Sequence, residues 1–332
     1  MEGRGHARTA CRRDGRGGSG PHQEGNLVAA RILLTGASGF VGRALLPAIN
    51  AAFPDSILQP FIGDIAQRSA VSAAIEQTRA DIVIHLAAIA AVPQAQRDLT
   101  RCFDVNLTGT LNLADEMLVH TPRAWLIYFG SGDCYGASFK SGRPVAETTP
   151  LAPLNSYAAS KSAADLTLGA LAAERGLRLL RLRPFNQIGP AMPESYAMGS
   201  FAAQLKRIQA GAAPPILEVG NLDAERDMVH VDDVAAAVVR ALTLIEAGKL
   251  PDNLVLNLAS GQPRRIGSML DDLIARSGLA VTIKADPARM RPSDIPRAVG
   301  DAHAARQTLN WEAKIPYQKW LSDLLKPNAK LP

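Results

Sequence analysis

Short apolar runs alternate along this chain with longer segments in which apolar residues recur at helical spacing. The helical spacing covers residues 98–119 and 155–175. The apolar runs have the length and composition of buried strands. They begin at residue 31 (RILLT) and continue over residues 81–88 (DIVIHLAA), 124–131 (AWLIYFGS) and 177–186 (LRLLRLRPFN). Strands that alternate with helices predict an α/β fold, a doubly wound parallel sheet with right-handed crossovers.

The pattern divides the chain into three parts. Residues 30–185 carry the alternating strands and helices and are predicted to form the main domain. Residues 186–325 are predicted to form a smaller α/β C-terminal domain, with some chain returning to the main sheet, since residues 230–242 have helical spacing and 255–260 resemble a strand. Residues 1–29 contain seven Gly and five Arg, so we expect a disordered basic tail, either an appendage or an arm for an anionic partner.

The composition excludes several classes of protein. The chain of 332 residues is 47% hydrophobic and 20% charged, so it can bury a large core. Part of the formal net charge of +5 belongs to the tail, so no nucleic-acid-binding surface is predicted. The three widely spaced cysteines predict neither a disulfide framework nor a metal site. No apolar run is long enough to span a membrane and no export signal is present, so the expected location is the cytoplasm.

Three glycines follow the first apolar run at a spacing that suits a dinucleotide. The first lets the chain turn tightly, the second lets the backbone approach a pyrophosphate, and the third lets the helix pack closely on the strand. The phosphates would lie on the amide groups at the helix N-terminus. The sequence therefore predicts a Rossmann-type nucleotide-binding domain. The candidate cofactor contacts on this turn are Gly36, Gly39, Phe40, Val41, Gly42 and Arg43.

A tyrosine, a lysine and a serine form the candidate catalytic group. Tyr157 and Lys161 are four residues apart in a predicted helix, so both can face one ligand. Ser131 ends the strand before that helix, at the edge of the sheet where a ligand binds. Tyr157 would exchange a proton with the substrate oxygen and Ser131 would bind that oxygen, while Lys161 would hold the nicotinamide ribose. We expect the Lys161 charge, together with a nicotinamide cation, to lower the pKa of Tyr157.

These motifs resemble the extended short-chain dehydrogenase/reductase superfamily, in the form that acts on nucleotide sugars. HLAA over residues 85–88 and NLTGT over 106–110 add to the resemblance. It implies a nicotinamide cofactor, NADP(H) or NAD(H), with Arg43 placed for the 2'-phosphate of NADP(H). It also implies a support for the active-site helix from Asn106, and a homodimer formed through the two helical segments. The further cofactor contacts that it implies are Asp64, Ile65, Leu86, Ala87, Ala88, Asn106, Tyr157 and Lys161.

The C-terminal third is similar to the branch of this family that acts on GDP-sugars. The similarity lies in LEVGNLDAERDMVHVDDV over residues 217–234 and DPARMRPSDIP over 286–296. It implies that Arg226 and Arg291 bind the diphosphate, each as a bidentate fork. It also implies that Asp294 binds the ribose and that Asn186 contacts the sugar or its phosphate. Arg289 is a third candidate for the diphosphate or an exposed, solvated side chain.

The reaction that the resemblance implies is the NAD(P)H-dependent reduction of a sugar ketone. The ketone is at C4 of a GDP-4-keto-6-deoxy-hexose, the product is GDP-6-deoxy-mannose (GDP-rhamnose), and Tyr157 is the proton donor. Asp133 belongs to the sequence SGD over residues 131–133 and is a further candidate substrate contact. It stands where the related dehydratases have a glutamate base. If Asp133 can act as a base, the alternative is a GDP-mannose 4,6-dehydratase, and a nucleotide-sugar 4-epimerase is a further one. A catalytically silent NADP-binding regulatory protein is the non-enzymatic alternative, which the presence of Ser131, Tyr157 and Lys161 disfavours.

Overall fold

The computed structural model describes residues 30–290 and 295–326. The tail predicted over residues 1–29, together with Arg291 and Asp294, lies outside the described residues. Six parallel strands form the main sheet in the order β2-β1-β3-β4-β5-β9. They are β1 (Arg31–Thr35), β2 (Ile57–Pro60), β3 (Ile82–His85), β4 (Trp125–Phe129), β5 (Arg178–Pro184) and β9 (Asn253–Leu258). The strand order reverses at β1, which creates the crevice where doubly wound folds bind ligands.

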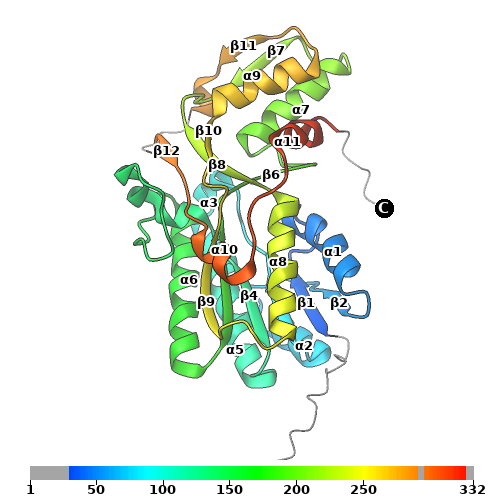
Figure 1. Ribbon diagram of the computed structural model, residues 1–332, viewed down its shortest axis with the longest axis vertical. Coiled ribbons are helices and arrows are strands. Elements are labelled where there is room, and N and C mark those ends of the chain that lie inside the picture. The colour runs from blue at the N-terminus through cyan, green and yellow to red at the C-terminus, as the bar shows by residue number, and fades with distance from the viewer. Residues whose placement is uncertain (1–29, 291–294, 327–332) are drawn as a thin grey trace, which may run out of the picture.

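Helices cover both faces of this sheet, as a doubly wound fold requires (Figure 1). Alternate residues of β1 face opposite sides, so Ile32 and Leu34 belong to one core and Leu33 to the other. The first core includes α1 (Phe40–Ala52) and α8 (Val231–Glu246), which pack together. The second includes α2 (Arg68–Thr78), α5 (Gly109–His120) and α6 (Ser156–Arg175). The predicted α/β fold with a Rossmann-type sheet is confirmed.

The segment expected to be helical over residues 98–119 is not one regular helix. Following α3 (Val92–Arg97), it consists of α4 (Leu99–Phe103), a π-helical turn over Asp104–Thr108 and then α5. The Asp98 carboxylate accepts a hydrogen bond from the Arg101 amide at 2.9 Å and caps α4. The π turn contains Asn106, and such turns occur frequently at functional sites.

The chain after β5 builds a second layer above the carboxyl ends of the strands (Figure 1). β8 (Glu225–His230) is its central strand and pairs with β6 (Asn186–Ile188), β10 (Pro263–Arg265) and β12 (Arg297–Ala298). A separate core joins helices α7 (Ala197–Gln209), α9 (Ile266–Ser277) and α11 (Tyr317–Leu325) to β7 (Ile216–Val219), which pairs with β11 (Thr282–Ala285). The remaining short elements are α10 (His303–Leu309) and the 3-10 segments Gly132–Ser141 and Pro287–Arg289.

Some chain returns from the second layer to the main sheet. α8 packs on α1, and β9 extends the sheet beside β5 with Leu182 opposite Leu256. Across the described residues, we find no helix with the length and apolar character of a membrane span.

Candidate active site

The glycine turn after β1 has the shape of a dinucleotide cradle. Gly36 has φ +70°, and a Cβ there would lie 2.7 Å from the Ala87 amide nitrogen. Gly39 precedes the first turn of α1, which contains no acidic residue, and a Cβ there would meet only the Gly36 carbonyl oxygen, at 3.1 Å. A Cβ on Gly42 would lie 2.3 Å from the Ala37 carbonyl oxygen. The residues therefore fit a pyrophosphate at the start of α1.

The other candidate cofactor contacts are spread around this turn. Phe40 and Val41 are half-buried in the first turn of α1, and Arg43 is exposed, with its guanidinium 3.5 Å from the Ala191 carbonyl oxygen. Leu86 and Ala87 pack directly on Gly36, and Ala88 follows them.

Asp64 is already paired within the protein. Its carboxylate accepts hydrogen bonds from the Ala66 amide at 3.0 Å and the Arg101 guanidinium at 2.7 Å. These contacts lower its pKa, the amide contributing most. Ile65 beside it is buried against Gly109. Asp64 is thus held as a carboxylate at the edge of the nucleotide-binding turn.

Ser131 and Tyr157 meet at the carboxyl end of β4. Ser131 lies just past β4, and its hydroxyl accepts a hydrogen bond from the Asp133 amide at 3.1 Å. The Asn155 side chain accepts a hydrogen bond from the Ala158 amide at 2.9 Å, which starts α6 and places Tyr157 in its first turn. The Ser131 hydroxyl is close enough to the phenol of Tyr157 to lower its pKa, against the larger effect of burial.

The pKa of Tyr157 in the protein without cofactor is set mainly by burial. Burial raises it well above the ordinary value, and the negative charge of Asp133 raises it further. Lys161 is not among the main groups that shift it. The expected lowering by the Lys161 charge together with a nicotinamide cation concerns the protein with bound cofactor. In the protein without cofactor, desolvation dominates and raises the pKa. A buried, protonated phenol is an acid that can donate a proton.

Lys161 lies one helical turn after Tyr157 in α6, where it is buried with 3% of its surface exposed. Its ammonium lies 4.5 Å from the centroid of the Tyr128 ring. Burial lowers its pKa to about 8, and the Asp165 carboxylate, one helical turn further along α6, opposes that shift. Asp165 is itself held by the Arg183 guanidinium through bonds of 3.0 and 2.8 Å. Lys161 thus remains a cation at neutral pH, near a carboxylate that Arg183 holds in place.

Asn106 joins the active-site helix to the segment after β3. Its side-chain amide donates to the Ser160 hydroxyl at 2.9 Å and to the Ile89 carbonyl at 3.1 Å, and its oxygen accepts from the Ile89 amide at 2.8 Å. Ser160 donates to the Tyr157 carbonyl at 2.8 Å. The buried Asn106 therefore fixes the first turn of α6 against the nucleotide-binding edge of the sheet.

A second buried chain of hydrogen bonds, absent from the sequence-based site, runs through His85. Thr35 at the end of β1 accepts from the Ala87 amide at 3.1 Å and lies 2.7 Å from Nδ1 of His85. Nε2 of His85 lies 2.9 Å from the Thr110 hydroxyl, which donates to the Asn106 carbonyl. A polar residue in the otherwise apolar run DIVIHLAA is the signal that could have found it, since a buried polar group needs partners.

The predicted substrate contacts Asn186, Arg226 and Asp133 lie toward the second layer. Asn186 is half-buried at the start of β6, and it pairs in register with Met228 of β8. Arg226 projects from β8, where burial lowers its pKa and the Asp133 charge opposes that shift. Tyr196, which sequence reasoning missed, also acts on Tyr157 and raises its pKa. The structure thus brings one Arg and one carboxylate together beside the catalytic tyrosine.

Arg289 is not a free cation. Its guanidinium contacts Asp286 at 3.1 Å and Glu218 at 3.3 Å, and it donates to the Ser200 hydroxyl at 3.1 Å. Of the two interpretations of Arg289, the diphosphate contact is the less favoured, because the Arg289 guanidinium is already bonded to groups that hold the segment after β11 against α7.

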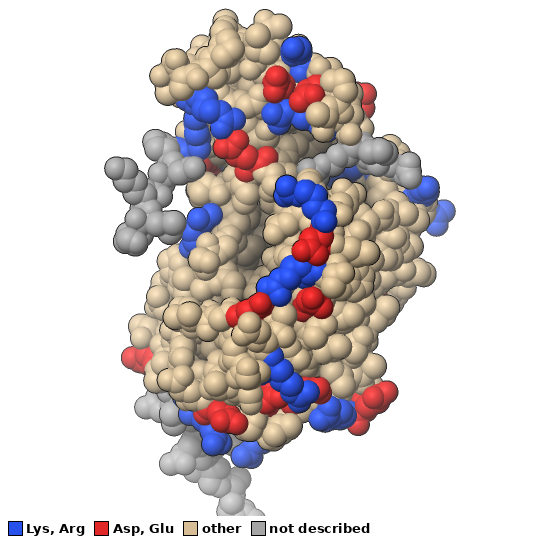
Figure 2. Space-filling model, turned by 180° about the vertical axis from the view of Figure 1, so that it is seen from behind, with Lys and Arg blue, Asp and Glu red and all other residues tan. Residues whose placement is uncertain are grey.

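Viewed from behind, the molecule is hollowed across its middle, between the two layers (Figure 2).

Residues 32–259 match the NAD dependent epimerase/dehydratase family. Over 300 residues the chain is 35% identical to GDP-6-deoxy-D-mannose reductase of Pseudomonas aeruginosa, covering 90% of this chain and 97% of that protein. It is 24% identical over 275 residues to GDP-6-deoxy-D-talose 4-dehydrogenase of Aggregatibacter actinomycetemcomitans, covering 82% of this chain and 88% of that protein.

Solved structures are similar over the same extent. The structure of RMD from Pseudomonas aeruginosa complexed with NADPH superposes with a TM-score of 0.81 at 32% identity, covering 90% of this chain and 98% of that one. UDP-glucose 4-epimerase of Thermus thermophilus complexed with NAD gives a TM-score of 0.76 at 26% identity, covering 89% of this chain and 97% of that one.

Proposed function

The chain belongs to the NAD dependent epimerase/dehydratase family, and from that premise we propose that it reduces the C4 keto group of a GDP-4-keto-6-deoxy-hexose. The product is GDP-6-deoxy-mannose. The observation that carries this proposal is the arrangement of Ser131, Tyr157 and Lys161 at the carboxyl end of β4, beside a glycine turn that fits a dinucleotide. In a reductase the tyrosine phenol donates a proton to the oxygen that becomes a hydroxyl.

The residues that would hold the cofactor are those of the glycine turn, with Arg43 and Lys161 around it. Asn106, expected as a further cofactor contact, is fully buried with its side chain bonded to Ile89 and Ser160, so it positions α6 instead. When bound, NADPH or NADH supplies the hydride for the carbonyl carbon. Ser131 donates a hydrogen bond to the substrate oxygen and polarises the carbonyl. Tyr157 then gives that oxygen its proton, and the Lys161 cation stabilises the phenolate that remains. Arg226 binds the diphosphate, which takes no part in the bond changes at C4, and orients the sugar.

Asp133 lies between the two ends of the proposed substrate site. Its charge acts to raise the pKa of Arg226 and of Tyr157, so it is near both. The side chain is one methylene shorter than the glutamate base of the related dehydratases, which supports reduction over dehydration. The 35% identity with a GDP-6-deoxy-D-mannose reductase supports the same substrate class.

The test follows absorbance at 340 nm with NADPH or NADH and GDP-4-keto-6-deoxy-mannose, made in place from GDP-mannose by a separate dehydratase. We expect loss of absorbance only when the keto sugar is present, and we expect Tyr157→Phe to lower kcat by a factor of about 10³ or more. Binding of NADPH to Tyr157→Phe, followed by fluorescence, is the control and should be unchanged. Conversion of GDP-mannose by this protein alone, without a separate dehydratase, would instead support the dehydratase function.

We propose a homodimer formed through the α5 and α6 face. Val119 of α5 and Leu166 of α6 are 62% and 59% exposed, so they are apolar side chains that a second copy of the chain could cover. Light scattering after size exclusion should give twice the monomer mass, and Leu166→Glu should give the monomer. Ile283→Glu, at an exposed position of β11, is the matched control and should remain dimeric. A monomeric wild-type protein would overturn this assembly.

A further inference from the structure

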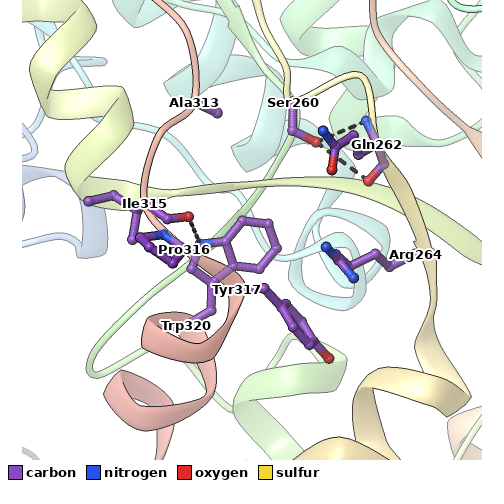
Figure 3. Close-up of a pocket in the computed structure, with 8 residues that line it drawn as sticks. All are labelled: Ser260, Gln262, Arg264, Ala313, Ile315, Pro316, Tyr317 and Trp320. Atoms are coloured by element: carbon purple, nitrogen blue, oxygen red, sulfur yellow. Dashed lines mark hydrogen bonds between the residues drawn. The ribbon is translucent and has the colours of Figure 1, made fainter.

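A pocket of about 180 Å³ lies between β10 and α11, away from the catalytic residues. Its walls include Ser260, Gln262, Arg264, Pro316, Tyr317 and Trp320. None of the residues that line it belongs to the glycine turn or to the catalytic group. In Figure 3 the Arg264 guanidinium points into this pocket, toward the Trp320 indole. The pocket is far smaller than the roughly 300–1,000 Å³ typical for drug-sized ligands, so it suits a small ion or molecule.

The aromatic walls of the pocket are fixed before any ligand binds. The Trp320 indole donates to the Ile315 carbonyl at 2.9 Å, and the Tyr317 hydroxyl donates to the Asp272 carboxylate at 2.8 Å. The two rings meet edge to face, with centroids 5.5 Å apart. The Arg264 guanidinium lies 4.1 Å from the Tyr317 ring centroid and 5.9 Å from that of Trp320. Contact with a ring face leaves the in-plane N–H groups of a guanidinium free to donate.

The charge of Arg264 is not balanced by a carboxylate of the described chain. Its Nε is buried without a hydrogen-bond partner there. Asp272 is occupied by the Tyr317 hydroxyl, and Asp227 accepts from the Ser260 hydroxyl and from the Gly261 amide. A buried N–H without an acceptor costs free energy, so an acceptor supplied by a ligand would be favourable here.

The strand register adds a second positive charge nearby. In the antiparallel pair of β10 and β8, Arg264 lies directly opposite Arg226. Residues opposite each other project from the same face of a sheet, and like charges in that position repel. The Arg264 charge without a carboxylate partner and the arginine opposite it make the surroundings of Arg264 favourable for an anion and unfavourable for a cation.

We propose that this pocket is a second anion site, in which Arg264 binds a phosphate group, free or as a small phosphomonoester, through its guanidinium fork. A tetrahedral oxyanion matches the paired N–H donors of arginine, and the Gln262 amide and Ser260 are the polar groups beside them. The site goes beyond the proposed reduction and does not depend on it. Because its walls come from the chain after β9 and from α11, a bound anion joins the main sheet to the C-terminal helix.

The test is isothermal titration calorimetry of the full chain with inorganic phosphate, in a buffer without oxyanions and at constant ionic strength. We expect saturable binding, weakened about tenfold or more in Arg264→Gln and partly retained in Arg264→Lys, which keeps the charge but not the fork. Arg265→Gln is the matched control, since Arg265 points to the other face and pairs with Asp223. Its affinity for phosphate should equal that of the wild type.

Three further titrations distinguish a separate phosphate site from an extension of the nucleotide cleft and from unspecific ion binding. Titration with glycerol 3-phosphate distinguishes a phosphomonoester from free phosphate as the better ligand, and binding of either supports the site. Saturation with GDP should leave phosphate binding to Arg264 intact, whereas competition would assign Arg264 to the nucleotide cleft and overturn a separate site. Equal heats from chloride, or an unchanged affinity in Arg264→Gln, would also overturn it. Because no titration measures turnover, the result does not depend on the reductase assay.

Discussion

Thr35 and His85 are joined by a buried hydrogen bond of 2.7 Å that fixes the tautomer of the histidine. The Thr110 hydroxyl donates to the Asn106 carbonyl at 2.8 Å, so it accepts from Nε2–H of His85. Nδ1 therefore accepts from Thr35, whose oxygen accepts from the Ala87 amide. His85 is neutral, since burial lowers its pKa to about 3. One histidine thus links the nucleotide turn to the π-helical turn that holds Asn106.

Replacing His85 by Gln should destabilise the protein by about 1–3 kcal/mol at pH 7.5, because at least one buried hydroxyl loses its partner. The cost should be smaller at pH 5.5. Below pH 6.5 the unfolded histidine binds a proton that the folded one does not, so the wild type loses stability as the pH falls toward about 3. At pH 5.5 this loss is about 1.4 kcal/mol.

Urea unfolding at the two pH values measures this difference. His303→Gln, at an exposed position, is the control. Its free energy of unfolding should change between the two pH values by the same amount as that of the wild type. An equal destabilisation by His85→Gln at both pH values would mean that His85 is not held neutral.

Replacing Asp133 by Asn should shift the alkaline limb of the kcat profile to lower pH. The Asp133 charge raises the pKa of Tyr157, so its removal makes the phenol lose its proton more readily as the pH rises. Spectroscopic titration of the Tyr157 phenol toward high pH, with the pH profile of ketone reduction beside it, measures the shift. Asp115→Asn, on the outer side of α5 near Arg175, should leave the profile unchanged. If the alkaline limb does not move in Asp133→Asn, the Asp133 charge does not act on the group that donates the proton.

Replacing Arg226 by Ala should raise the KM for the GDP-sugar about tenfold or more and change kcat little. The reason is that Arg226 would contact the diphosphate, whose environment is the same before and during hydride transfer. Initial rates against substrate concentration give both constants. Arg297→Ala is a matched control on the neighbouring β12, where Arg297 is half-exposed and pairs with Glu225. A fall in kcat alone would contradict this placement of Arg226.

Replacing Arg43 by Ala should raise the KM for NADPH about tenfold and leave that for NADH nearly unchanged. Arg43 is exposed beside the glycine turn, with one 3.5 Å contact to the Ala191 carbonyl, so its guanidinium can reach a 2'-phosphate. Steady-state kinetics with each coenzyme decides the matter. An equal rise for both coenzymes would instead show that Arg43 contacts a part that they share, such as the pyrophosphate.

Local signals along the chain are sufficient to predict several elements of the fold and the site. The run RILLT and the three glycines predict β1, the tight turn at Gly36 and the start of α1, because a strand, a turn and a helix each depend on neighbours within a few residues. The spacing of Tyr157 and Lys161 predicts a shared helical face for the same reason. The π-helical turn at Asn106 was not predicted.

The environment of these residues follows from the folded chain and not from local sequence. Burial and the nearby Asp133 raise the pKa of Tyr157 in the protein without cofactor. Arg264 lies over Tyr317 and opposite Arg226, whereas Arg289 is paired with carboxylates. Desolvation and charge pairing depend on groups that are distant in sequence and adjacent in space, and no local pattern along the chain encodes which of them meet.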